Sequence, residues 1–168
     1  IGSSFFPEDG KIRPVLIRKS TDALKFSKKL NRKNYSRYNE NLNNFKKDEL
    51  YFKISILEAL EEDGFKMVYQ PILDVVSNKI LRAEALLRWD KQNISINTEQ
   101  IIKISEDYGL IHQLDFYVVR KVCQDIGKYD FAGIKIAINM SYLTIGTQNV
   151  AVEIIGIIEQ YKINPSSI

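Results

Sequence analysis

The sequence predicts an α/β domain over most of the chain, with a small α+β unit in front of it. From Phe65 onward, short segments of strand character alternate with longer segments of helical periodicity, which is the pattern of βα architectures. Ahead of this region, a polar stretch at residues 39–47 separates it from a differently patterned N-terminal segment. Two units joined by a linker are therefore expected.

The N-terminal unit is predicted at residues 1–38. An apolar strand end at residues 1–6 is followed by a turn at residues 7–10, whose sequence is PEDG. Pro14 suits the first turn of a helix, because its missing N–H has no partner there. The helix carries a stripe at helical spacing, formed by Leu16, Ser20, Ala23, Ser27 and Leu30. Tyr35 and Tyr38 have strand character and close the unit.

Residues 39–48 are predicted to be the linker, and residues 49–168 the main domain. The main domain opens with a helix that has Leu50, Ile54 and Leu57 on one face and ends at Asp63 and Gly64. The remaining elements follow from the change of hydrophobic period. Strands are expected at about 66–70, 80–89 and 134–140, and helices at about 98–107, 111–128 and 149–161.

Composition and charge exclude several classes of protein. The net charge is only +3 and the lysines are scattered, so binding to a nucleic-acid polymer is not supported. No apolar run approaches the roughly 20 residues of a membrane span, and no signal peptide is recognisable. The single cysteine, Cys123, cannot form an intramolecular disulfide, which favours a reducing, cytoplasmic location. Its apolar neighbours Val119 and Val122 indicate a buried, inert thiol.

The second predicted strand carries a polar face. Because side chains alternate along a strand, Arg82, Glu84, Leu86 and Arg88 share one side of it. One interpretation is an antiparallel sheet whose polar face meets water. The other is an α/β barrel whose polar strand faces line the mouth of the lumen, where such enzymes place their sites. The alternation alone leaves both open.

The residue types on these strands have a definite chemistry. Carboxylate and amide oxygens, such as those of Glu84 and Asn139, are the ligands that Mg²⁺ or Mn²⁺ prefers. The planar guanidinium of Arg88 can donate two hydrogen bonds to a phosphate.

Four segments occur in the order and at about the separations seen in one known family. They are residues 69–72 (YQPI), 84–89 (EALLRW), 105–111 (SEDYGLI) and 138–141 (INMS), and Asp115 stands where that family usually has an aspartate. In these features residues 50–168 resemble the EAL-type domain of bacterial cyclic di-GMP phosphodiesterases. The loop at residues 90–97 departs from the family, because it lacks the usual glycine and proline.

The resemblance implies a fold, an activity and a site. The fold would be part of a TIM-like (β/α) barrel with its first strand antiparallel to the others, and the reaction would hydrolyse cyclic di-GMP to linear pGpG. Glu84 and Asn139 would be ligands of Mg²⁺ or Mn²⁺, which makes Glu84 the catalytic residue in this chain. Arg88 and the backbone around Leu86 would hold a phosphate, and Gln70 would contact the substrate.

Two other residues near this pattern receive different roles. His112, the single histidine, lies at a position that varies in the family, so no function is assigned to it. Glu106 matches a family glutamate near the barrel mouth and is interpreted as a structural residue at a helix end.

Residues 1–38 resemble the C-terminal end of a different family, the GGDEF-type diguanylate cyclases. The resemblance lies in residues 1–2 and 6–10 and in the segment from Asp22 to Lys28, and it is eroded at Lys25, where that family has a tyrosine. The segment that names the family is not in this sequence, so no cyclase activity is assigned. GGDEF followed by EAL is a common tandem, and we expect this chain to be part of a longer signalling protein, whose attachment to a membrane is left open.

The main domain is expected to be the first half of a barrel. A complete barrel takes about 200 to 250 residues, so the other metal ligands would lie elsewhere and the chain alone would be inactive. Its open strand edge would allow pairing with a second copy, as in a homodimer. The alternatives are a cyclic di-GMP receptor that does not cleave its ligand, and an interaction module that does not bind it.

Overall fold

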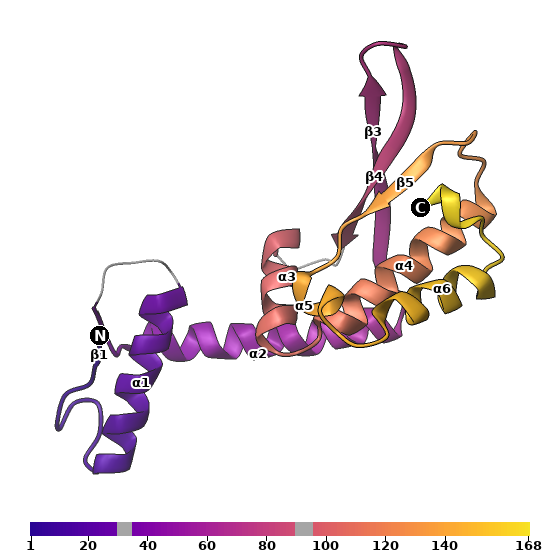
Figure 1. The fold of residues 1–168 in the computed structure, drawn as a ribbon. Coiled ribbons are helices and arrows are strands. Elements are labelled where there is room, and N and C mark those ends of the chain that lie inside the picture. Colours follow the sequence, from indigo (N-terminus) through magenta and orange to yellow (C-terminus); the bar gives the residue numbers. More distant parts are fainter. Residues whose placement is uncertain (30–34, 90–95) are drawn as a thin grey trace. The chain divides into compact units, whose positions relative to one another are not determined.

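The chain forms two compact units, Ile1–Phe52 and Lys53–Ile168. The computed structural model describes residues 1–28, 35–39, 50–89 and 96–168 in full, and the backbone alone at 29 and 40–49. The boundary between the two units falls inside one helix (Figure 1). Each unit is described by itself below.

The first unit is a short parallel strand pair packed on a helix. Strands β1 (Gly2–Ser3) and β2 (Ser36–Arg37) pair in register, and helix α1 (Arg13–Lys29) lies between them in the sequence. A Cβ atom at Gly2 would lie 2.0 Å from the carbonyl oxygen of Ser20 in α1, so only glycine permits this close approach. Ala23 of α1 is fully buried here, and Tyr38 is nearly so. This agrees with the predicted α+β unit.

Helix α2 (Glu40–Glu61) begins earlier than the sequence predicted. The helix expected from about Leu50 starts at Glu40, so nearly all of the predicted linker at 39–48 has helical backbone. These residues contain neither glycine nor proline, and a polar sequence without either can continue a helix. The predicted end is confirmed, since Asp63 adopts a left-handed conformation with φ 57° just after the helix.

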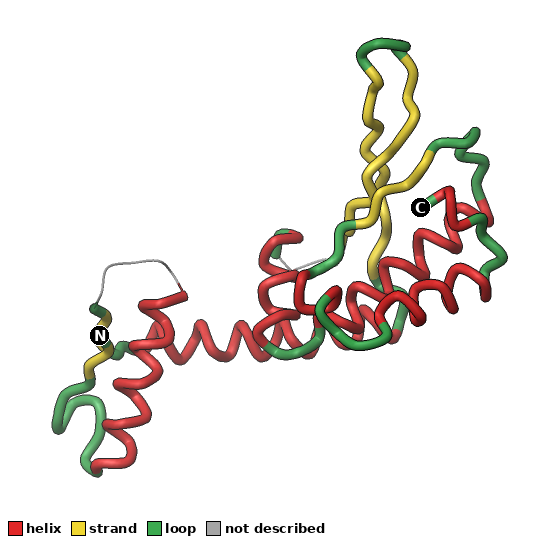
Figure 2. Tube along the Cα trace, in the orientation of Figure 1, coloured by secondary structure: helices red, strands yellow, loops and turns green. Residues whose placement is uncertain are grey.

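A three-stranded sheet carries the polar face of the second unit. Strands β3 (Phe65–Asp74) and β4 (Lys79–Trp89) are antiparallel, and β5 (Lys135–Ile138) is parallel to β4. The first strand therefore runs against the other two, as expected for this barrel type. Pairing with β5 covers only residues 82–85 of β4, so the far end of the β3–β4 hairpin projects beyond β5 (Figure 2).

The helices of the second unit agree closely with the predicted ranges. Helices α3 (Thr98–Asp107) and α4 (Ile111–Lys128) have the predicted bounds, and α6 (Val150–Gln160) differs by one residue at each end. A capping box defines the start of α3: the Asn97 side chain accepts from the Gln100 N–H, and the Gln100 side chain accepts from the Asn97 N–H. The short helix α5 (Tyr142–Ile145) and the 3₁₀ turn Pro165–Ser167 were not predicted.

Helices cover the apolar side of the sheet. The buried strand residues Ala83, Ala85 and Ile136 lie on that side, where Ala83 pairs with Ile136. Cys123 of α4 is fully buried, in a cluster with Ile158 of α6, and burial raises the pKa of its thiol. The predicted burial of the Cys123 thiol is thus confirmed, and the helix-covered sheet with its parallel pair favours the barrel interpretation. No helix in the described part of the chain is both long and apolar enough to span a membrane.

Asp63 links the end of α2 to α4 and supports a pH prediction. Its carboxylate accepts from Lys121 Nζ at 2.8 Å and from the Tyr117 hydroxyl at 2.6 Å. Burial alone would raise the pKa of Asp63, but hydrogen bonds from Lys121 and Tyr117 lower it on balance. A carboxyl group whose pKa is lowered by folding stabilises the fold above its unfolded pKa, and this stability is lost as the pH falls through the folded pKa.

We expect Asp63→Asn to lower the free energy of unfolding at neutral pH by less than about 1 kcal/mol, because the pair is solvent-screened. The difference from wild type should vanish at acid pH. Asparagine also tolerates the left-handed backbone, so the substitution isolates the charge. Urea unfolding, monitored by the fluorescence of Trp89, the single tryptophan, measures the free energy of unfolding at neutral and at acid pH. Glu62→Gln is the matched control, and an equal loss in that variant would contradict the assignment to Asp63.

Candidate functional site

Glu84 and Asn139 meet on the polar face of the sheet. Glu84 lies in the middle of β4, and Asn139 follows the last residue of β5. Because Ala85 pairs with Ile138, the end of β5 is brought beside Glu84, although the two side chains are 55 residues apart in sequence. The amide Nδ2 of Asn139 donates to Oε1 of Glu84 at 2.5 Å. The structure thus joins the two residues predicted to be metal ligands.

Gln70 lies on the same face. It pairs directly with Glu84 across the antiparallel β3–β4 ladder, and residues directly opposite in such a ladder project to the same side of the sheet. Ala137 of β5 pairs with Glu84 on its other side and offers only a methyl group. Gln70, Glu84 and Ala137 therefore form a row across the three strands, and Asn139 reaches Glu84 from just past the end of β5.

Leu86 and Arg88 continue this face toward the end of β4. Leu86 is half-buried and lies just past Ala85, where the pairing with β5 ends, so its backbone is next to the end of that ladder. Arg88 is exposed, and its Nη1 donates to the carbonyl oxygen of Leu87 at 2.8 Å. The same carbonyl accepts from the hydroxyl of Thr98 at 3.1 Å, which ties the start of α3 to the end of β4. A guanidinium has five N–H donors, and this bond uses one of them.

Ser141, two residues after Asn139, is hydrogen-bonded to two carboxylates. Ser141 donates from its hydroxyl to Glu106 Oε1 at 2.8 Å and from its backbone N–H to Asp115 Oδ2 at 3.1 Å. Asp115 is buried, and burial raises the pKa of its carboxyl group, while the hydrogen bond from the Ser141 N–H acts in the opposite direction. The sequence identified both acids but missed their shared partner. The available signal was Asp115 itself, a carboxylate within the apolar stripe of α4.

The donor types at Glu84 and Asn139 fit a hard divalent cation. A carboxylate oxygen and an amide oxygen are ordinary ligands of Mg²⁺ or Mn²⁺, and the two groups are in contact. Across residues 1–28, 35–39, 50–89 and 96–168, no three histidine, cysteine, aspartate or glutamate side chains gather closely enough to hold a metal ion. The pair therefore fits as part of a larger ligand set.

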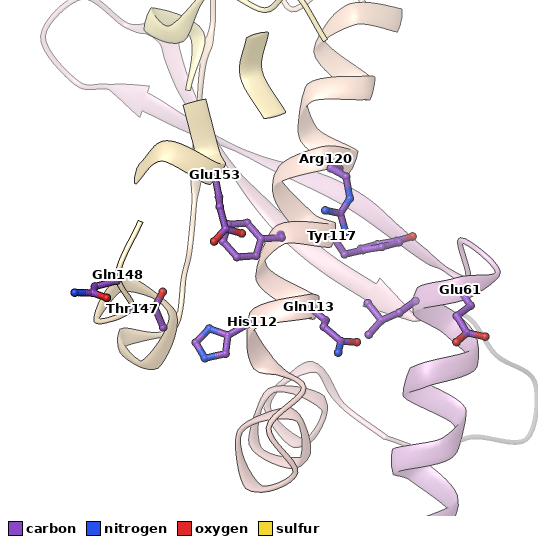
Figure 3. Close-up of a pocket in the computed structure, with 10 residues that line it drawn as sticks. Glu61, His112, Gln113, Tyr117, Arg120, Thr147, Gln148 and Glu153 are labelled. Atoms are coloured by element: carbon purple, nitrogen blue, oxygen red, sulfur yellow. The ribbon is translucent and has the colours of Figure 1, made fainter. Parts of the chain in front are cut away.

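A separate cavity of about 500 Å³ lies among the helices. It is lined by Glu61 at the end of α2, by His112 and Arg120 of α4, and by Glu153 of α6 (Figure 3). None of the residues predicted for the site on the strands lines it. His112 thus lines this cavity together with residues that are not among those predicted for the site on the strands.

Comparison with known proteins gives one family and several relatives. A family model described as "EAL domain" matches residues 54–168. The cyclic di-GMP phosphodiesterase NbdA of Pseudomonas aeruginosa is 29% identical over 164 residues, which cover 95% of this chain and 21% of NbdA. The bifunctional diguanylate cyclase/cyclic di-GMP phosphodiesterase MucR of the same organism is 25% identical over 170 residues, 99% of this chain and 25% of MucR. The chain thus spans about a fifth to a quarter of the length of these relatives.

Solved structures agree with the fold. A PaMucR phosphodiesterase in complex with c-di-GMP superposes with a TM-score of 0.63 at 24% identity, covering 68% of this chain and 48% of that one. The EAL domain of Xanthomonas citri FimX in complex with c-di-GMP has a TM-score of 0.63 at 19% identity, covering 74% and 49%. These likenesses confirm the predicted TIM-like barrel fold, of which this chain contributes β3, β4 and β5.

Proposed function

Because this chain belongs to the EAL-domain family, we propose that it is part of a bacterial signalling protein that hydrolyses cyclic di-GMP to linear pGpG. The single observation that carries the proposal is the contact between Glu84 and Asn139 on the polar strand face. It brings together two residues with hard oxygen donors, one on β4 and one just past β5, next to Gln70 and on the strand face that also carries Arg88. The names of the relatives point to the same nucleotide.

The residues divide the chemistry among them. Glu84 and Asn139 would hold Mg²⁺ or Mn²⁺, and a cation bound there would polarise a phosphate oxygen and lower the pKa of the attacking water. Arg88, with the backbone at Leu86, holds the phosphate by charge-assisted hydrogen bonds. Gln70 contacts a guanine through its amide. In the reaction the water oxygen forms a new P–O bond, one ester P–O bond breaks, and a proton passes to the leaving ribose oxygen.

The first unit has a different origin in this proposal. Residues 1–38 are the end of a GGDEF-like domain, and α2 leads from it into the EAL domain. The parallel pair of β1 and β2 on α1 is consistent with such a remnant. No cyclase activity is proposed for it.

The experiment that tests the function measures binding and cleavage together. We expect the complete protein that contains these residues to bind cyclic di-GMP in calorimetry and to release pGpG in the presence of Mg²⁺ or Mn²⁺, detected by chromatography. The 168-residue chain alone should release none, because its described residues supply only part of a metal ligand set.

The outcomes separate the alternatives. Binding without pGpG at any metal concentration would indicate the receptor, and absence of binding by the complete protein would indicate an interaction module. Release of pGpG by the 168-residue chain alone would contradict the proposed need for further ligands. An unrelated dinucleotide such as linear ApA serves as the ligand control.

A further inference from the structure

We propose that Glu106 and Asp115 act as a carboxylate clamp that positions Asn139 beside Glu84. The clamp is defined as these two carboxylates and their shared partner, Ser141. Its catalytic consequence rests on the proposed function, since it assigns positioning residues to that same site. The positioning of Asn139 by the clamp concerns the geometry of this chain and can be tested without cyclic di-GMP.

Ser141 is hydrogen-bonded to residues of three helices, two of which carry the carboxylates of the clamp. Glu106, in the last turn of α3, accepts a hydrogen bond from the Ser141 hydroxyl at an O–O distance of 2.8 Å, and Asp115 of α4 accepts one from the Ser141 N–H at an N–O distance of 3.1 Å. The hydroxyl oxygen also accepts from the N–H of Leu143, so Ser141 caps α5. The backbone and the side chain of one residue are thus bonded to separate elements, which defines both its place and its orientation.

Asn139 lies between this anchor and the sheet. On one side of it, Ile138 is paired with Ala85 of β4. On the other side, only Met140 separates it from Ser141. Because consecutive Cα atoms are about 3.8 Å apart, a segment fixed at both ends over so few residues has little freedom. The position of the Asn139 side chain at 2.5 Å from Glu84 therefore depends on the anchor at Ser141.

Both carboxylates occupy places that are unfavourable for stability alone. Asp115 is only 6% exposed, and burial disfavours its charged form. Glu106 is in the last turn of α3, where the helix dipole disfavours a negative charge, and that turn carries no basic residue. Local departures of this kind tend to occur where a protein positions a functional group. Two of them converge on the residue that anchors Asn139.

The rival interpretation is that the clamp only stabilises α5. The NMR signals of the Asn139 side chain distinguish this interpretation from a positioning role. We expect Glu106→Ala and Asp115→Ala, in the 168-residue chain, to shift and broaden the side-chain NH₂ resonances of Asn139 in ¹⁵N–¹H spectra. Glu106→Gln and Asp115→Asn retain an oxygen that can accept from Ser141, so they should restore resonances close to those of wild type. Glu99→Ala, at the exposed start of α3, is the control and should leave them unchanged.

The complete protein provides the second measurement. Mutation of a residue that hydrogen-bonds to a metal ligand or holds it in place typically lowers metal affinity or activity about 10–100-fold. We expect each alanine variant to raise the Mg²⁺ concentration for half-maximal rate by about that factor, with KM for cyclic di-GMP nearly unchanged. The glutamine and asparagine variants should recover most of the loss.

Each outcome has a definite meaning. If the Asn139 resonances stay at their wild-type positions in both alanine variants while the spectra remain dispersed, the clamp is overturned. If an alanine variant does not fold, Ser141→Ala decides the question by the same resonances; it removes the hydroxyl's bonds to Glu106 and to the Leu143 N–H and keeps the backbone bond to Asp115. A wild-type protein that neither binds nor cleaves cyclic di-GMP would refute the proposed function, whereas the spectra would still decide the clamp.

Discussion

Glu84→Gln in the complete protein is expected to lower kcat for cyclic di-GMP hydrolysis by about 10²–10³-fold, because a metal ion contributes several kcal/mol to such reactions and about 1.4 kcal/mol corresponds to a factor of ten. The substitution removes the negative charge that would bind the cation. It preserves shape, and the glutamine Oε1 can still accept from Asn139 Nδ2. The loss should therefore appear in the rate and in the metal requirement, and not in the fold.

The measurement is steady-state release of pGpG over a range of Mg²⁺ concentrations, with circular dichroism to confirm folding. Glu153→Gln is the matched control, since Glu153 is an exposed glutamate of α6 that lines the separate helical cavity. A Glu84→Gln enzyme with wild-type kcat at all Mg²⁺ concentrations would remove Glu84 from the ligand set. The proposed mechanism would then need another residue to bind the cation.

Phe65→Ala is expected to lower the free energy of unfolding of the second unit by about 3–5 kcal/mol, which is the usual cost of removing a buried aromatic ring. Phe65 begins β3 and is 2% exposed. Its ring contacts Trp89 with centroids 5.2 Å apart and Tyr117 with centroids 5.8 Å apart. Its carbonyl oxygen also lies 3.0 Å from the Tyr117 hydroxyl, so one residue connects β3, β4 and α4.

A loss of this size is a large part of the total stability of a domain, which is about 5–15 kcal/mol. Urea unfolding monitored by circular dichroism is the appropriate assay, because the substitution also changes the surroundings of Trp89. Tyr142→Ala removes an aromatic ring that is 76% exposed and should change the stability by no more than about 0.5 kcal/mol. Similar losses in the two variants would show that Phe65 is not a core residue.

Local sequence patterns were enough for the helices of the second unit. The bounds of α3 and α4 were predicted because apolar residues recur at helical spacing and the sequence offers clear ends, with Asn97 as a cap and Gly109 at φ 70° between the helices. The buried state of Cys123 followed from its apolar neighbours on the same stripe. These features depend on residues a few positions apart.

The bounds of elements that depend on a paired strand or a capping residue were predicted less accurately. Strand β3 continues through Pro71 to Asp74 because β4 lies opposite it, and Pro71 is tolerated in this edge strand. Strand β5 stops at Ile138, three residues after it starts, because β4 pairs with it only over a short stretch. Helix α5 forms where Ser141 caps it, and its four residues are too few to show a period.

The family, the βα alternation and the polar face of β4 could be predicted from the sequence, because identity, hydrophobic period and side-chain alternation are properties of neighbouring residues. The contacts between distant residues become visible in the folded chain alone. The contact of Glu84 with Asn139 follows from the pairing of β4 with β5, and the bonds of Ser141 follow from the packing of α3 and α4. Such contacts join residues that are far apart in the sequence, and local sequence patterns do not indicate which distant residues come into contact.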